Sequence, residues 1–304
     1  MSKENITVSV FILTYNQEQF IAQTIESIVT QKTSFRYQLV IGEDASQDKT
    51  LEICRSFRER YPEKIKLLAS PQNLGLIANF MHTLKECKGA YIAICDGDDY
   101  WTDPLKLQKQ VDFLKQHSDY KIVYSLKQDL LPDGTFKKST QLSMPETTTF
   151  DDLVMGNFIP SVTVLFKNET LFRDPPSWII NFPYGDWPLY LWTLVDGGKI
   201  KFMYEVMGTY RTEIGTSSVL RKTLSDAFMV NVSILDYAIN DAQFELKRPL
   251  LKKAKLFTMG ALMKSYNREG SYLKAFGVFF RILSSKPSWS AIKMYFYSLK
   301  KHIY

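Results

Sequence analysis

Three aspartates stand within four positions of one another, directly after an apolar run. They are Asp96, Asp98 and Asp99, in the segment CDGDDYW at residues 95–101. Carboxylates so close together repel one another unless solvent or a cation neutralises them. Oxygen ligands suit a hard divalent cation, Mg²⁺ or Mn²⁺, whose coordination shell is often completed by substrate phosphates. A solvated turn rich in Asp and Gly is the alternative, but the position after a predicted strand favours the cation site.

A second acidic cluster, GEDASQD at residues 42–48, also follows a predicted strand. Asp44 could accept hydrogen bonds from a nucleobase N–H or from ribose hydroxyls. Ser46 or Asp48 could instead cap the helix that follows. The two interpretations are compatible, with Asp48 as the cap and Asp44 as the ligand.

Two further loops carry side chains that could contact a nucleotide. Thr14, Tyr15 and Asn16 follow the first predicted strand and combine a hydroxyl, an aromatic face and a helix cap. Asn16 is predicted as the N-cap because Gln19 stands three residues further on. The Asn-Leu-Gly segment at residues 73–75 is a common turn signal. Each signal is weak alone, and its position after a strand makes it informative.

The elements that must position these loops alternate between strand and helix patterns. Strands are predicted at residues 8–13, 37–41, 65–68, 90–95 and 122–124. Helices are predicted at residues 20–29, 50–61, 77–87 and 104–117. Such alternation predicts an α/β fold with a largely parallel sheet covered on both faces. All four loops fall at the carboxyl ends of these strands, where ligands bind in such sheets.

Beyond residue 125 the pattern becomes irregular and then helical. The predicted elements are a turn at residues 131–134, strands at 163–166 and 200–204, and a helix near 186–195. From Leu220 onward the sequence predicts helices, broken near Pro249, Gly270 and Pro287. The chain therefore divides into an α/β body and a helical extension.

Composition favours a globular protein of a reducing compartment. Hydrophobic residues make up 45% and charged residues 23% of the 304, so disorder is not expected. Cys54, Cys87 and Cys95 are few and odd in number, which predicts buried thiols. The apolar run at residues 8–13 is too short for a signal peptide, and no stretch reaches the roughly 18 apolar residues that span a bilayer. A cytoplasmic protein is therefore predicted.

Charge is distributed unevenly along the chain. From Lys247 to the end there are 13 Lys and Arg but one acid, Glu269, a net charge of +12, so the rest must carry −6 to give the total of +6. One apolar face of the last helix is predicted from Trp289, Ile292, Phe296, Leu299 and Ile303. This tail fits docking on an anionic membrane surface, or packing on the catalytic domain or in a dimer. No nucleic-acid partner is expected, because the body is acidic.

Taken in order, the motifs resemble those of one family. The segments VFILTYN (10–16), EDASQDKT (43–50), NLG (73–75) and DGDD (96–99) are similar to motifs of the inverting glycosyltransferases of family 2, which have the GT-A fold. The resemblance covers about residues 6–215. Each motif is loose, but four in this order, each after a predicted strand, are specific.

The resemblance implies a donor site for a nucleoside-diphosphate sugar. Its implied members are Thr14, Tyr15, Asn16, Asp44, Asn73, Asp96, Asp98, Asp99 and Arg211. Thr14 and Asp44 would contact the nucleobase, and Asp96 would face the ribose. Asp98 would bind the Mn²⁺ or Mg²⁺ ion that bridges the diphosphate, and Asp99 would assist it.

The family also supplies a general base from an acid that opens a later helix. In this chain the matching segment is YGDW at residues 184–187, so Asp186 is the predicted base. Tyr184 and Trp187 would offer aromatic faces to the acceptor sugar. The alternative for Asp186 is a plain helix N-cap.

Three departures from the family pattern stand out. Glu43 precedes Asp44 where the family often has two Asp, and no basic residue follows the turn at residues 73–75. A Tyr-Arg-x-His segment, common in the family, reads Tyr-Arg-Thr-Glu here, so Glu213 replaces the imidazole. A third metal ligand at that position would be a carboxylate or absent, while Arg211 could still approach phosphate.

The implied activity is inverting transfer of a sugar from a nucleoside diphosphate, with a UDP-sugar favoured, to a glycan or lipid-linked acceptor in cell-surface polysaccharide synthesis. The implied GT-A catalytic domain spans residues 1–220, with a donor half at 1–125 and an acceptor half at 126–220. The basic helical extension at 221–304 would attach the cytoplasmic protein peripherally to the inner face of the cell membrane.

Two alternative functions are weighed against this one. A nucleotidyltransferase would need a Gly-rich, basic loop after the first strand, and residues 11–16 contain neither Gly nor Lys. A non-catalytic nucleotide-sugar-binding or assembly subunit would keep the same fold. The presence of Asp96, Asp98 and Asp186 argues against that second alternative.

Overall fold

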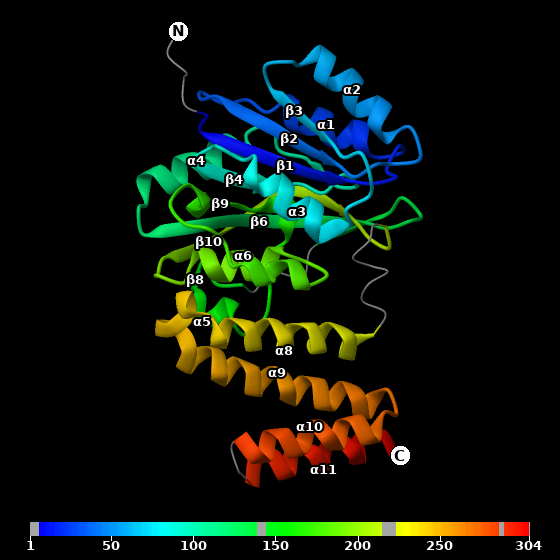
Figure 1. Cartoon of the computed structure of the whole chain (residues 1–304), viewed down its shortest axis with the longest axis vertical. Helices are drawn as coiled ribbons and strands as arrows, with labels where there is room; N and C mark the ends of the chain where they lie inside the picture. Colours follow the sequence, from blue (N-terminus) through cyan, green and yellow to red (C-terminus); the bar gives the residue numbers. More distant parts are fainter. Residues whose placement is uncertain (1–5, 139–143, 215–222, 286–288, 304) are drawn as a thin grey trace. The chain divides into compact units, whose positions relative to one another are not determined.

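The computed structural model describes residues 6–138, 144–214, 223–285 and 289–303. The chain forms two compact units, which are coloured along the sequence in Figure 1. Met1–Phe150 and Phe158–Ser218 form the first, here called the α/β unit. Asp151–Asn157 and Val219–Tyr304 form the second, here called the helical unit.

Parallel strands form the first half of the α/β unit. β1 (Val8–Thr14) lies between β2 (Tyr37–Glu43) and β4 (Tyr91–Ile94), and β3 (Ile65–Ala69) lies at the edge beyond β2 (Figure 1). All seven residues of β1 are buried, as expected for a strand covered on both faces. The predicted parallel arrangement of these strands is confirmed.

Helices cover both faces of this half. They are α1 (Ile21–Val29), α2 (Thr50–Arg60), α3 (Leu76–Lys85) and α4 (Lys106–Gln116). α1, α2 and α4 share an apolar core with alternate residues of β1, including Ile12. Phe11 points the other way and meets Phe80 of α3, with ring centroids 5.3 Å apart. The two-residue period of a strand thus assigns the helices to opposite faces.

The second half of the sheet is mixed. β9 (Leu165–Lys167) runs antiparallel between β4 and β6 (Tyr120–Leu130), and β10 (Lys199–Arg211) runs parallel to β6. β5 (Tyr100–Trp101) pairs antiparallel with the far side of β10. β6 and β10 both extend well beyond the strands predicted from the sequence.

The strand predicted at residues 163–166 is corrected at its start. Ser161–Thr163 form a turn of 3-10 helix, and the strand begins only at Leu165. The physical reason is that the carbonyls of Val162 and Thr163 accept hydrogen bonds from side chains rather than from a neighbouring strand.

Short elements complete the α/β unit and its junction with the helical unit. They are β7 (Phe136–Lys138), β8 (Thr147–Thr149), α5 (Phe150–Leu153), the 3-10 turns Glu169–Leu171 and Ser177–Asn181, and α6 (Asp186–Thr193). The turn predicted at residues 131–134 joins β6 to β7, with Gly134 at φ +84°. Cys54, Cys87 and Cys95 are free and buried, as predicted.

The prediction that Asn16 caps the first helix is wrong. α1 begins at Ile21, with Phe20 in the N-cap position. Asn16 has φ +52°, and its Oδ1 accepts a hydrogen bond from the backbone N–H of Gln47 at 2.8 Å. Because Asn tolerates this left-handed conformation, the residue turns the chain toward the next loop instead of starting the helix.

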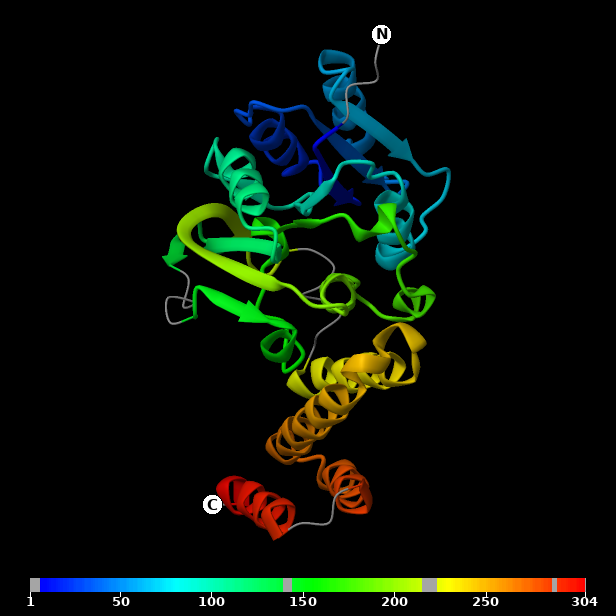
Figure 2. The ribbon, with the colours of Figure 1, turned by 90° about the vertical axis from the view of Figure 1, so that its left-hand side faces the viewer.

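The helical unit is built from successive helices (Figures 1 and 2). They are α8 (Leu224–Asn240), the 3-10 turn Ala242–Lys247, α9 (Arg248–Arg268), α10 (Tyr272–Ser285) and α11 (Trp289–Ile303). Pro249 lies in the first turn of α9, and Gly270, at φ +73°, separates α9 from α10. The third predicted break, Pro287, lies outside the described residues. Within the described part of the chain, no helix is long and apolar enough to cross a bilayer.

The apolar face predicted for the last helix is divided by the structure. Ile292 and Leu299 pack against the core of the helical unit, where Tyr295 is buried and stacks on Phe279 with ring centroids 4.4 Å apart. Trp289 and Phe296 are exposed instead. The side chain of Ile303 lies outside the described ones. Packing therefore accounts for the inner part of this face, and an outer aromatic part remains exposed.

Candidate active site

The loops at the carboxyl ends of β1, β2 and β4 are joined by backbone hydrogen bonds. The N–H of Asp44 donates to the carbonyl of Thr14 at 3.1 Å, and the N–H of Gly97 donates to the carbonyl of Leu13 at 3.0 Å. Strand order places these three loops side by side, because β1 lies between β2 and β4. The acidic loops at residues 42–48 and 95–101 therefore meet across the end of β1.

Asp44 is buried and holds the turn that contains Asn73. Its carboxylate accepts hydrogen bonds from the N–H groups of Leu74 at 2.7 Å and Gly75 at 2.9 Å. The Nδ2 of Asn73 donates in return to the Asp44 carbonyl at 3.2 Å. Gly75 has φ +84°, which suits glycine and allows the close approach. The structure therefore joins two predicted site residues, and a nucleobase contact by Asp44 stays a prediction.

The loop after β1 presents its three predicted residues differently. Thr14 is buried, and its hydroxyl donates to Oε1 of Gln17 at 2.8 Å. Tyr15 is exposed, so its ring is accessible to a ligand. Asn16 is also exposed, and its N–H donates to the Ser46 hydroxyl at 3.0 Å. Thr14, Tyr15 and Asn16 thus lie at the same edge as Asp44, with Tyr15 and Asn16 exposed.

Gly97 allows the acidic loop to lie against β1, so a larger residue at this position should destabilise the protein. A Cβ at this position would lie 2.2 Å from Gln17 Oε1, 2.9 Å from Thr14 Oγ1 and 3.0 Å from the Leu13 carbonyl oxygen. Gly97→Ala should therefore lower the unfolding free energy by about 1–3 kcal/mol. Denaturant unfolding measures this, with Gly156→Ala as the control because nothing lies within 4 Å of its Cβ. Equal loss in both variants would contradict the close packing.

Asp96, Asp98 and Asp99, in the loop at residues 95–101, influence one another's pKa values. Burial, and then the charges of Asp98 and Asp186, raise the pKa of Asp96 to about 7. Burial also raises the pKa of Asp98, and burial with the charge of Asp98 raises the pKa of Asp99 well above its usual value. Full ionisation of the cluster therefore needs an additional positive charge.

Arg211, at the end of β10, contacts this cluster. Its backbone N–H donates to Asp99 Oδ1 at 2.9 Å, and its guanidinium donates to the carbonyl oxygen of Asp98. The guanidinium also lies over the rings of Phe20 and Tyr100, 4.8 Å and 4.9 Å from their centroids. Its positive charge lowers the pKa of Asp98 against the effect of burial. Arg211 thus supports the acidic loop, while an approach to phosphate stays a prediction.

The donor set fits a hard divalent cation. Asp99 Oδ2 is buried and has no hydrogen-bond partner among the described residues, which leaves it available to a ligand. No group of three or more His, Cys, Asp or Glu in the described ranges has the arrangement of a metal site. Asp98 and Asp99 offer a pair of carboxylates, and a metal ion held by them stays a prediction. Glu213 is exposed, with φ +62°, in the turn after β10.

Asp186 opens α6 and lies near the acidic loop. Burial, and then the charge of Asp186, raise the pKa of Tyr190. The charge of Asp186 also adds to the effects of burial and of Asp98 on the pKa of Asp96, so the three side chains lie near one another. Gly185 permits this position, because a Cβ there would lie 2.9 Å from Ile77 Cδ1 on α3. Trp187 is buried in the core, so the prediction that its ring flanks the acceptor sugar is wrong.

Two residues of the site were missed by sequence reasoning. The Ser161 hydroxyl donates to Asp96 Oδ2 at 3.3 Å, across 65 residues of sequence. Thr24, on α1, donates to the carbonyls of Gly97 at 2.9 Å and Asp99 at 2.6 Å. Thr24 is a polar residue on the buried face of an amphipathic helix, a signal that could have identified it. Ser161 carries no comparable signal.

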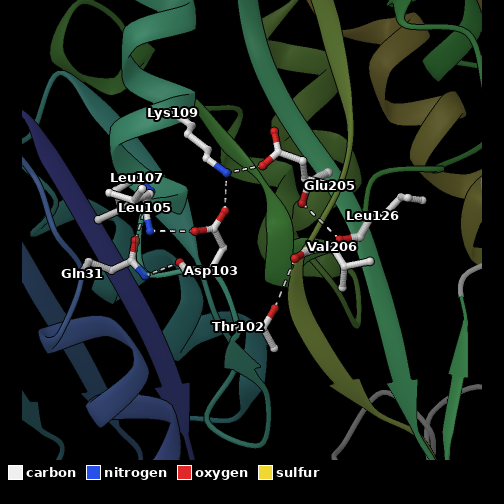
Figure 3. A network of polar contacts seen from close by, with 10 residues as sticks. Gln31, Thr102, Asp103, Leu105, Leu107, Lys109, Leu126, Glu205 and Val206 are labelled. Atoms are coloured by element: carbon white, nitrogen blue, oxygen red, sulfur yellow. Dashed lines mark hydrogen bonds and ion pairs between the residues drawn. The ribbon is translucent and has the colours of Figure 1, made fainter.

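A polar network holds the chain that leaves the acidic loop (Figure 3). Asp103 precedes α4, and its carboxylate accepts from the Leu105 N–H at 2.8 Å and pairs with Lys109 at 2.8 Å. Lys109 also pairs with Glu205 of β10. Gln31, at the end of the α1 segment, donates to the Asp103 carbonyl at 2.7 Å. The network ties this loop to α1, α4 and β10, the elements around the cluster.

Sequence comparisons match this chain to one family model and to several relatives. The model of glycosyl transferase family 2 matches residues 9–169. An uncharacterized protein of Mycobacterium bovis is 33% identical over 205 residues, which cover 67% of this chain and 58% of that protein. The putative teichuronic acid biosynthesis glycosyltransferase TuaG of Bacillus subtilis is 30% identical over 164 residues, covering 53% of this chain and 62% of that protein. The chain thus spans less than two thirds of the length of these relatives.

Solved structures share the fold. TarS residues 1–349 of S. aureus, in complex with UDP-GlcNAc, align with a TM-score of 0.60 and 17% identity over 98% of this chain and 81% of that one. The mannosyltransferase PcManGT from Pyrobaculum calidifontis, in complex with GDP-Man and Mn²⁺, aligns with a TM-score of 0.61 and 16% identity over 99% and 82%. The mixed sheet flanked by helices is the GT-A architecture, as predicted. Because the family model matches more than half of the sequence, the chain belongs to glycosyl transferase family 2.

Proposed function

We propose that this chain is an inverting, metal-assisted glycosyltransferase that uses a nucleoside-diphosphate sugar. The observation that carries the proposal is the joining of two acidic elements from distant parts of the sequence. The loop with Asp96, Asp98 and Asp99 follows β4, and Asp186 opens α6, yet the charge of Asp186 acts on Asp96. Sugar transfer needs a donor site and a base for the acceptor side by side, and this arrangement supports both assignments.

On the donor side, the chain's own residues would bind and orient the nucleotide. Thr14 and Asp44 would face the base, and Asp96 the ribose. Asp98 and Asp99 would hold Mg²⁺ or Mn²⁺; when bound, such an ion stabilises the negative charge that grows on the leaving diphosphate. The Mn²⁺ in the structure of PcManGT supports this assignment.

On the acceptor side, Asp186 would act as the general base. It takes the proton of the acceptor hydroxyl while the oxygen attacks the anomeric carbon. The new carbon–oxygen bond forms as the bond to the diphosphate breaks, so one displacement inverts the centre. Asp186 stands in the first turn of α6, whose amino end carries partial positive charge. No covalent carboxylate intermediate is required.

We assign residues 1–220 to catalysis, with the donor half at 1–125 and the acceptor half at 126–220. The proposed donor is a UDP-sugar, supported by the UDP-GlcNAc bound to TarS. The proposed acceptor is a glycan or lipid-linked glycan of the cell surface, supported by the teichuronic acid assignment of TuaG.

The test is turnover and calorimetric binding with a panel that includes UDP-GlcNAc and GDP-mannose with Mn²⁺. If no member binds, the chain is not a donor-using enzyme; if members bind without turnover, it is a non-catalytic subunit.

We further propose that the helical unit docks on an anionic phospholipid surface from the cytoplasmic side. On α10, Leu273 is 89% and Phe280 is 56% exposed, two helical turns apart, and on α11 Trp289 is 78% exposed. Lys274 and Arg281 directly follow the first two of these residues. Exposed apolar side chains beside cations fit a membrane surface of negative charge, where lipid-linked acceptors reside.

This docking makes a prediction for vesicle binding. Replacing Leu273 and Phe280 together with Ser should reduce co-sedimentation of the full chain with phosphatidylglycerol-containing vesicles by at least ~10-fold, because two apolar side chains lose their burial in the interface. Wild-type binding should also fall in high salt, because screening acts beyond roughly 8–10 Å. Phe172→Ser is the control, since Phe172 is 85% exposed but belongs to the α/β unit. Equal sedimentation of wild type and the double variant would exclude this surface.

A further inference from the structure

Lys106 carries a fully buried amine that the proposed chemistry does not use. Its Nζ donates to Gln110 Oε1 at 2.8 Å and to the carbonyl oxygen of Val164 at 3.4 Å. It also lies 4.2 Å from the centre of the Trp101 ring. Burial lowers the pKa of Lys106 to about 7, against the opposing influence of Cys95 and Asp103. A buried amine of this kind is costly compared with an apolar side chain of similar size, so its presence needs a reason.

Three side chains bind three consecutive backbone carbonyls. Trp101 Nε1 donates to the carbonyl of Val162 at 2.7 Å, and Gln110 Nε2 donates to that of Thr163 at 2.8 Å. Lys106 donates to the carbonyl of Val164, the next residue in sequence. It also donates to Oε1 of Gln110 and thereby orients the side-chain amide of Gln110. We call Trp101, Lys106 and Gln110 the carbonyl clamp. Trp101 belongs to β5 at the end of the acidic loop, and Lys106 and Gln110 belong to α4.

The clamped segment begins at the residue that contacts Asp96. Ser161 is the first residue of the 3-10 turn, and its hydroxyl donates to Asp96 Oδ2 at 3.3 Å. The turn is fixed on its other side by Thr163, whose hydroxyl donates to the Ser125 carbonyl at 3.0 Å. The next three carbonyls in sequence after Ser161 are the ones that the clamp holds.

We propose that the carbonyl clamp positions Ser161 as a donor-binding residue beside Asp96, with Lys106 as the positioning residue that joins Trp101 to Gln110. The proposal rests on the assignment of Asp96 to the ribose of a nucleoside diphosphate. Ser161 orients the Asp96 carboxylate, and the residue is itself half-buried. Loss of the clamp therefore weakens nucleotide binding without removing any group that touches the nucleotide.

A double-mutant cycle tests the coupling. UDP with Mn²⁺ is titrated calorimetrically into the wild type, Ser161→Ala, Lys106→Met and the double variant. Each single change should weaken binding roughly 5- to 10-fold, the scale of one hydrogen bond, and the double variant should be no weaker than the weaker single. Lys115→Met is the control, because Lys115 is an exposed residue of α4 that does not contact the clamped segment. Multiplicative losses, or wild-type affinity in Lys106→Met, would overturn the proposal.

A second measurement does not depend on any nucleotide. The three native cysteines are buried, so the thiol of Ser161→Cys can be alkylated selectively by iodoacetamide. Contact with the Asp96 carboxylate disfavours its thiolate and slows alkylation. Adding Lys106→Met should accelerate alkylation several-fold, whereas adding Lys115→Met should not. Trp101→Phe, which keeps a ring beside Lys106 but cannot bind the Val162 carbonyl, should reproduce the acceleration if Lys106→Met fails to fold.

The two measurements separate the two proposals. If the alkylation rates respond as expected but UDP does not bind the wild type, the assignment of Asp96 to a nucleotide is wrong and the clamp is supported. If UDP binds the wild type but neither affinity nor alkylation responds to Lys106→Met and Trp101→Phe, the clamp is only structural and the proposal is overturned.

Discussion

Asp98→Asn should reduce sugar transfer by at least ~10³-fold while the protein stays folded. The amide has the shape of the carboxylate but not the charge that holds a divalent cation, so the leaving diphosphate loses its main electrostatic stabilisation. The fold should survive because burial already raises the pKa of Asp98 and thus favours a neutral group at this position. Turnover of the donor with a titration of Mn²⁺, together with thermal unfolding, measures both effects.

A matched control is available on α4. Asp112 accepts hydrogen bonds from Gln108 at 2.9 Å and lies away from the acidic loop, so Asp112→Asn should keep turnover within about two-fold of wild type. Excess chelator should stop turnover by the wild type, and added Mn²⁺ or Mg²⁺ should restore it. Full activity of the wild type in excess chelator would show that no divalent cation takes part.

Asp186→Asn should lower transfer by roughly 10²–10⁴-fold and leave donor affinity unchanged. Asparagine keeps the shape of the side chain but cannot take the proton of the acceptor hydroxyl, and this range is the usual effect of losing a general base. Donor binding should survive because no nucleotide contact is assigned to Asp186 itself. Calorimetric donor binding and acceptor-dependent turnover are measured on one preparation.

Glu213→Gln is the comparison for this second prediction. Glu213 is exposed in the turn after β10, and it is the next candidate for the base if Asp186 fails. We expect Glu213→Gln to change turnover little. If Asp186→Asn keeps turnover within a few-fold of wild type, Asp186 has only a structural role at the start of α6. A large loss of turnover in Glu213→Gln would then identify Glu213 as the base. Large losses in both variants would indicate two acids acting on the acceptor.

Local sequence determined the elements whose structure depends on near neighbours. The apolar run of β1 and the strand–helix alternation predicted the parallel half of the sheet. The position of three acids after β4 predicted that they share one loop, and an acid after Tyr184-Gly185 predicted that Asp186 opens a helix. These features follow from periodicity and from turn chemistry over a few residues, which the sequence carries directly.

The tertiary structure alone decided which of these residues meet. The insertion of β9 between β4 and β6, the hold of Asp44 on the turn with Asn73, and the contact of Ser161 with Asp96 all depend on strand order. The burial of Lys106, like the exposure of Trp289 on a face predicted to be apolar, depends on which elements pack against it. No local period encodes these outcomes, because hydrogen bonds and packing between distant segments are selected only when the sheet and its helices assemble.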